Sequence, residues 1–170
     1  MWKYTGQERP PFAEQPAPGQ ESVWDYPRPP ALVASEAVVE IFAGELKIGT
    51  SKRSLRVLET ASPPTFYLPA ADIHWDRLQR VAGSSYCEWK GMASYWALAS
   101  APGEGAVGWS YDSPSTRFAA IDGHISFYPA LVDCRVNGEA VEPQPGGFYG
   151  GWVTKNIAGP FKGGPGTGHW

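Results

Sequence analysis

The sequence predicts a mainly β, β-tent-like domain of short antiparallel strands with one short helix and two aromatic, Pro/Gly-rich arms. Gly and Pro contribute 20 and 17 of the 170 residues, which excludes a helix bundle or a coiled coil. Hydrophobic residues nevertheless make up 42% and aromatic residues 14% of the chain, which favours a folded core over disorder. At this length we expect one globular domain with appendages.

The charge pattern limits the classes of function. The formal net charge is −3, and the basic residues are scattered apart from a small cluster at Lys52, Arg53 and Arg56, so we expect no nucleic-acid partner. No apolar run approaches the roughly 20 residues of a membrane span, and the N-terminus lacks the apolar stretch of a signal peptide. We therefore expect a soluble, cytoplasmic protein with no membrane partner, whose Cys87 and Cys134 are free thiols.

Residues 1–34 are predicted to form an extended arm. Seven prolines lie there, and each removes a backbone donor and fixes φ. A pure linker would not need the large aromatic residues that the arm also carries. They are Trp2, Tyr4, Phe12, Trp24 and Tyr26. We expect part of the arm to pack along the domain or on a partner chain, which leaves open a homo-oligomer held by the arms.

The first strands follow directly. Enrichment in Val and Ile predicts a strand over residues 36–42, and a turn at Gly44 leads it back into a second strand over 46–50. A strand over 56–59 is interrupted by two adjacent prolines and resumes over 66–68.

The one helix is expected over residues 70–80, where Ile73 and Arg77 fall one turn apart. Later strands are predicted over residues 94–98, 107–111, 124–128 and 131–136. Asn137-Gly138 follows the last of them and is the strongest two-residue hairpin signal, because both turn positions need φ > 0.

A second arm completes the chain. Residues 143–170 are rich in Gly but hold five aromatic residues, so this arm is also too aromatic for a free linker. Gly163 and Gly168 have the spacing of a phosphate-binding loop, but His169 and Trp170 stand where that loop needs Lys and then Ser or Thr, so we predict a coil. The expected organisation is therefore an arm over 1–34, a β-rich domain over 35–142 and an arm over 143–170.

Two aromatic strings carry the densest functional signal. Residues 87–96 and 107–111 hold three Trp, two Tyr and one Lys, a set that can line a pocket for a flat or cationic ligand. The alternative is an aromatic core, but Lys90 rarely sits in such company without a partner or a ligand. The predicted ligand-binding residues are Arg56, Glu59, Tyr67, Trp89, Lys90, Tyr95, Trp96, Trp109 and Tyr111.

Three side chains are candidates for catalysis. Glu59 lies on an otherwise apolar strand face, where a carboxylate needs a partner such as Lys90 or Arg56 unless it reaches solvent at the strand end. Cys87 lies close to Lys90, which favours the thiolate, although a buried structural thiol is the alternative. We therefore predict a binding domain for an unknown small molecule. An enzyme using Glu59, Lys90 or Cys87 in the same pocket and an assembly module acting through the arms are the alternatives.

The same strings resemble the domain family DUF427, which is sometimes labelled nucleotidyltransferase-like. The motifs occur in order over residues 36–135. They are Arg56-Val57-Leu58-Glu59-Thr60, Pro63-Pro64-Thr65-Phe66-Tyr67-Leu68-Pro69, Cys87-x-Trp89-Lys90-Gly91-x-Ala93-Ser94-Tyr95-Trp96, Trp109-Ser110-Tyr111 and Phe127-Tyr128. The Gly-rich ending resembles that of a longer subgroup. Glu88 departs from the pattern, because a proline is commoner before Trp89, and this alters the charge beside Lys90.

The resemblance implies a small β-tent-like domain, whose relatives include zinc-bound methionine sulfoxide reductases and domains with a tryptophan cage for small ligands. This chain lacks paired Cys-x-x-Cys knuckles, and its histidines are dispersed, so no metal or other cofactor is expected. The nucleotidyltransferase label is not adopted, because that chemistry needs clustered carboxylates around metal ions and the sequence offers no such pair.

Overall fold

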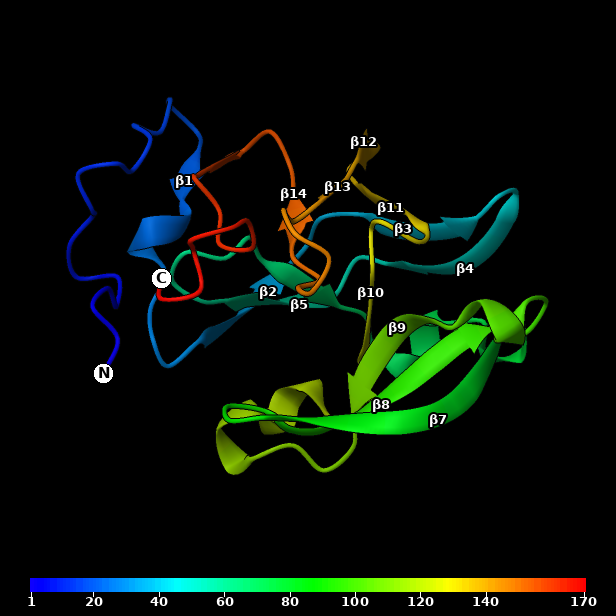
Figure 1. Ribbon diagram of the computed structural model, residues 1–170. Coiled ribbons are helices and arrows are strands. Elements are labelled where there is room, and N and C mark those ends of the chain that lie inside the picture. Colours follow the sequence, from blue (N-terminus) through cyan, green and yellow to red (C-terminus); the bar gives the residue numbers. More distant parts are fainter.

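Short strands in five small sheets make up most of the fold (Figure 1). The structure is a computed structural model and describes all 170 residues. The first sheet is antiparallel, in the order β12-β11-β3-β4. Its strands are β3 (Val39–Ala43), β4 (Leu46–Ser51), β11 (Asp133–Val136) and β12 (Glu139–Ala140). Both predicted hairpins are confirmed here, and Asn137 and Gly138 have φ of 49° and 81°, as the turn between β11 and β12 requires.

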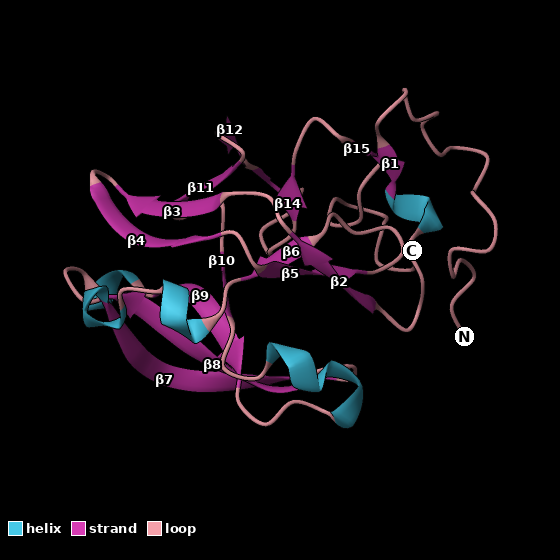
Figure 2. Ribbon diagram, turned by 180° about the vertical axis from the view of Figure 1, so that it is seen from behind, coloured by secondary structure: helices cyan, strands magenta, loops and turns pink.

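A second antiparallel sheet, in the order β10-β9-β8-β7, faces the first. Its strands are β7 (Leu78–Cys87), β8 (Gly91–Leu98), β9 (Ala106–Tyr111) and β10 (Ile125–Phe127). Figures 1 and 2 show the two sheets as separate layers, with β10 crossing the space between them. The main core, 14 buried residues, fills that space. Ile41 and Ile48 enter it from the first sheet, and Val107 and Phe127 enter it from the second.

The third sheet has the order β2-β5-β6 and is also antiparallel. Its strands are β2 (Ala31–Ser35), β5 (Ser54–Leu58) and β6 (Thr65–Tyr67). The predicted strand interrupted at the prolines is confirmed as β5 and β6, which pair with each other. A backbone bridge from Leu68 to Ile125 ties this sheet to β10.

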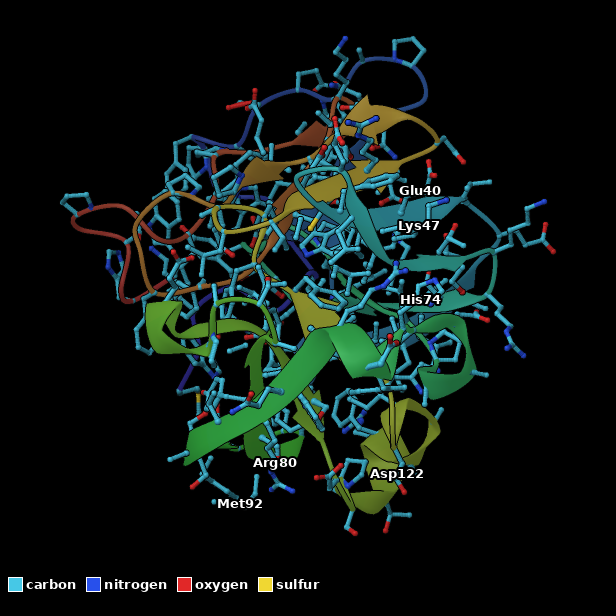
Figure 3. All side chains as sticks on the ribbon, turned by 90° about the vertical axis from the view of Figure 1, so that its right-hand side faces the viewer. Glu40, Lys47, His74, Arg80, Met92 and Asp122 are labelled. Atoms are coloured by element: carbon cyan, nitrogen blue, oxygen red, sulfur yellow. The ribbon has the colours of Figure 1, made fainter.

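The outward face of the first sheet carries a charged pair on β3 and β4. Glu40 lies between the buried Val39 and Ile41 on β3 and therefore points away from the core. Its carboxylate is 3.5 Å from the ammonium of Lys47 on the neighbouring strand, and both are labelled in Figure 3. The mainly β class predicted from composition and alternation is confirmed.

The prediction of a helix over residues 70–80 is wrong. Two single 3₁₀ turns, η2 (Ala70–Asp72) and η3 (Trp75–Arg77), stand there, and β7 begins at Leu78. Ile73 forms a backbone bridge to Gly49, which fixes the segment against β4 in an extended conformation. Pairing with the sheet therefore outweighs the weak helical spacing. The other 3₁₀ segments are η1 (Val23–Asp25), η4 (Pro102–Glu104) and η5 (Thr116–Ile121).

The two arms pack on their own domain. Strand β1 (Glu21–Ser22) of the first arm pairs in parallel with β15 (Ile157–Ala158) of the second. Trp24 is fully buried, with the ring of Trp170 at 5.2 Å, and the ring of Phe12 stacks on Trp170 at 5.1 Å. The remaining small sheet pairs β13 (Glu142–Pro143) with β14 (Trp152–Val153). No helical segment in the chain has the length and apolar character needed to cross a bilayer.

Candidate functional site

A cavity of about 420 Å³ opens beside the second core cluster, where the third sheet meets the second sheet and a loop of the C-terminal arm. The second sheet contributes residues from β7, β8 and β9, and the loop over residues 144–151 contributes Gln144 and residues 148–151. Seven of the residues singled out in the sequence line this one cavity. They are Glu59, Tyr67, Cys87, Lys90, Tyr95, Trp109 and Tyr111.

Strand alternation explains why these side chains meet. Trp109 and Tyr111 are two residues apart on β9 and therefore face the same side, as the sequence predicted. The Tyr67 hydroxyl accepts the indole N–H of Trp109 at 3.0 Å, and the two rings are perpendicular at 6.1 Å. On the neighbouring strand the Tyr95 hydroxyl is 2.5 Å from the hydroxyl of Ser85. These contacts hold the rings in fixed positions around the open space.

Arg56 and Trp96 were expected at this site and do not line it. Arg56 neighbours Val57, which lines the cavity, so alternation turns Arg56 to the other face of β5. Its guanidinium lies 2.6 Å from the carboxylate of Glu21. In the same way Trp96 neighbours Tyr95 and points to the opposite face of β8.

On that face the ring of Trp96 packs edge-on against Trp75 at 4.8 Å, and its indole N–H donates to Ser110 at 2.9 Å. Trp89 does not line the cavity either. It lies in the turn between β7 and β8 and packs beside the second core cluster, while its carbonyl accepts a hydrogen bond from Ser115 at 2.8 Å.

The sequence missed a whole wall of the cavity. The loop over residues 144–151 covers one side, and a Cβ built on Gly150 would lie 2.5 Å from the ring of Trp109. Only glycine allows the backbone to approach the ring so closely. Tyr128 adds another ring, 4.6 Å from that of Trp109. Aromatic residues between the glycines of the tail were the one available signal. The lining residues not singled out as site residues are Val57, Ser62, Pro63, Thr65, Ser85, Tyr86, Ala93, Tyr128, Gln144, Phe148, Tyr149, Gly150 and Gly151.

Two charged side chains line the cavity, Glu59 and Lys90. Glu59 has a partner, because its carboxylate lies 3.4 Å from the guanidinium of Arg28, whose side chain is only 2% exposed. Lys90 forms no ion pair, and its ammonium lies 5.7 Å from the centre of the Tyr111 ring. Burial works to lower the pKa of Lys90. Tyr67, Cys87 and, more weakly, Glu59 outweigh burial and raise that pKa. Lys90 is therefore a cation at neutral pH.

The tyrosine hydroxyls of the cavity keep their protons. Burial is the main cause that raises the pKa of Tyr67, Tyr111 and Tyr128, and for Tyr128 the value is about 12. These groups therefore act as neutral hydrogen-bond donors rather than as bases.

The two thiols differ in access. Cys87 is half-buried and lines the cavity, whereas Cys134 is 1% exposed and belongs to the main core. Burial raises the pKa of the Cys134 thiol strongly. Only Cys87 is therefore placed to react with a molecule in the cavity. No group of three or more His, Cys, Asp or Glu side chains comes together in the chain as a candidate metal site.

Comparison with known proteins finds one family. The family model described as "Domain of unknown function (DUF427)" matches residues 31–138. No curated protein matches the chain. The match confirms the resemblance that the motifs indicated and extends it to both ends, so that it includes β2 and the β11–β12 turn. It includes Glu59 and Lys90 but ends before the loop over 144–151 that closes the cavity.

Proposed function

The chain belongs to the DUF427 family, and we propose that it binds a small, flat molecule in the cavity beside Trp109. The observation that carries this proposal is convergence. Side chains from segments far apart in sequence, among them Glu59, Lys90 and Gln144, border the same open space. The β-tent-like architecture implied by the sequence resemblance is part of the same proposal, because such domains include small-ligand binders.

The space is of a size that suits a ligand. Ligand pockets enclose roughly 300–1,000 Å³, are mostly apolar and carry a few placed polar groups. This cavity has about 420 Å³, with aromatic rings on several sides and hydroxyls between them. A plain aromatic core would leave few voids larger than a water molecule, whereas these rings touch one another and still border an open space.

Filling the cavity tests the proposal. Ser62 lines it from a loop, so Ser62→Tyr places a ring in the space without disturbing a strand. Ser100→Tyr, on an exposed turn, is the matched control. We expect small aromatic compounds to raise the melting temperature of the wild type and of Ser100→Tyr but not of Ser62→Tyr. A library in which every stabilising compound acts equally on both variants would refute binding in this cavity.

An enzyme using the same cavity is the second candidate, and the position of Cys87 on the cavity wall near Lys90 favours it. The Cys87 thiolate would attack an electrophilic ligand held by the rings. This candidate predicts that Cys87→Ser keeps ligand binding but traps no covalent adduct. Adducts that persist in Cys87→Ser would exclude the role of this thiol.

A further inference from the structure

The charges around the cavity do not balance, and from this we infer that its ligand is an aromatic compound with an anionic group, which Lys90 binds. The inference rests on the proposed function and narrows the ligand class. It departs from the cationic ligand that aromatic rings alone allow. Three observations support it: the pairing of Glu59 with Arg28, the further basic group near them and the hydroxyl donors of the lining.

The one carboxylate of the cavity is already neutralised. Glu59 faces the buried guanidinium of Arg28, which reaches it from the N-terminal arm at 3.4 Å. Lys90 is the other charged lining residue and forms no ion pair within the protein, and the polar groups beside it are the Cys87 thiol and the Tyr67 hydroxyl. A ligand that enters the cavity therefore meets an uncompensated ammonium. An anionic group on the ligand supplies the partner that a half-buried ammonium lacks.

A further basic group lies beside the loop over residues 144–151, which lines the cavity. Lys162, from the C-terminal arm, is 7% exposed, and its ammonium lies 5.6 Å from the ring of Tyr149, which lines the cavity. Its ammonium donates to the main-chain oxygen of Trp170 at 3.2 Å, and the same oxygen accepts from Arg28 at 2.8 Å. Arg28 and Lys162 thus add two basic side chains near Glu59, and Glu88 is the other carboxylate whose charge acts on Arg28.

The neutral polar groups of the cavity include hydroxyls that can donate to an anion. The Tyr67 oxygen already accepts from the indole N–H of Trp109, whereas the Tyr111 hydroxyl lies beside the Cys87 thiol. The Gln144 side chain is held in place from both ends, because its oxygen accepts from the Gly151 N–H at 3.1 Å and its amide donates to the Lys162 carbonyl at 2.6 Å. An ammonium ligand would meet the like charge of Lys90. A carboxylate or sulfonate finds matching partners.

Cys87 provides a test that needs no knowledge of the natural ligand. Methanethiosulfonate reagents convert a thiolate to a mixed disulfide and release methanesulfinate, and they exist with an anionic sulfonatoethyl or a cationic trimethylammonioethyl group. We would measure both labelling rates and divide each by its rate with 2-mercaptoethanol, which removes the intrinsic difference. The ratio of the two reagents also cancels the thiolate fraction of Cys87. Cys87→Ser checks that labelling occurs at this thiol, since Cys134 is buried.

We expect the normalised labelling rate of the anionic reagent to exceed that of the cationic reagent. Lys90→Met should lower this anionic-to-cationic ratio by roughly tenfold. Lys90→Arg retains the preference, and so does Lys52→Met, which removes a lysine from an exposed turn. A ratio that favours the cationic reagent, or one that Lys90→Met leaves unchanged, would overturn the inference. Because this assay measures charge and not ligand binding, it can fail while the Ser62→Tyr experiment still supports the cavity as a binding site.

Discussion

Replacing Gly150 with alanine disturbs the loop that closes the cavity. The added methyl group would lie 2.5 and 2.8 Å from two ring carbons of Trp109 and 3.2 Å from the ring of Tyr128. Carbon atoms in contact normally stay about 3.5–4.0 Å apart, so something must move by about 1 Å. Trp109 is 7% exposed and hydrogen-bonded to Tyr67, whereas Phe148 in the loop is 83% exposed. The loop is therefore the part that yields.

The expected cost follows from the clash. Overpacking by a methyl group typically costs about 1–3 kcal/mol, and we expect the low end because an exposed loop relaxes. In a chain of this length about 1 kcal/mol lowers the melting temperature by roughly 2–4 °C. Displacement of the loop also admits water to Trp109, so tryptophan emission shifts to the red and acrylamide quenches it more. The matched control is Gly147→Ala, whose methyl group meets nothing within 4 Å.

The assay compares thermal unfolding and acrylamide quenching for the two alanine variants and the wild type. A Trp109→Phe background shows whether the change in quenching comes from this indole. If Gly150→Ala matches Gly147→Ala in both measurements, the loop does not rest on Trp109, and the cavity lacks the wall described above.

Three more predictions concern the surroundings of the site. The hydrogen bond from Arg56 lowers the pKa of Glu21, so this pair stabilises the fold above the unfolded pKa of about 4.3, and the contribution disappears as pH falls through the lower folded value. Glu21→Gln should therefore lower the free energy of unfolding, measured with urea at pH 7, by about 0.5–1 kcal/mol, because the pair is partly exposed. Near pH 2 the substitution should have no effect, and a cost that does not depend on pH contradicts this linkage. In the native protein at pH 8, a maleimide should label Cys87 and leave Cys134 unmodified, as read by peptide mass spectrometry; equal labelling would mean that the main core is open. Deleting residues 1–20 should lower the melting temperature without changing the number of subunits that light scattering gives, because these residues pack on their own chain; a smaller number of subunits would favour assembly through the arms.

Local signals in the sequence were sufficient where a structure depends on neighbouring residues. The Asn137-Gly138 turn could be predicted because its backbone angles need those residue types. Strand β7 could not, since it is an edge strand with mostly exposed side chains and shows no apolar alternation. The false helix over 70–80 has the same origin, because pairing of distant strands decided the conformation and helical spacing did not.

The same distinction applies to the site. Alternation was enough to place Trp109 and Tyr111 together, and applied strictly it would also have removed Trp96, which directly follows Tyr95 on its strand. No local pattern indicated that the loop over 144–151 returns to cover the cavity. That return depends on packing between parts of the chain that are far apart in sequence.

Isothermal titration with three compounds that share one ring system measures the central claim most directly. Indole-3-acetate, indole-3-acetamide and tryptamine carry an anionic, a neutral and a cationic group on the same indole. We predict that indole-3-acetate binds the wild type about tenfold more tightly than the other two and that Lys90→Met removes this advantage. Tightest binding by tryptamine, or the same order of affinities in Lys90→Met, would show that the unpaired ammonium does not select the ligand.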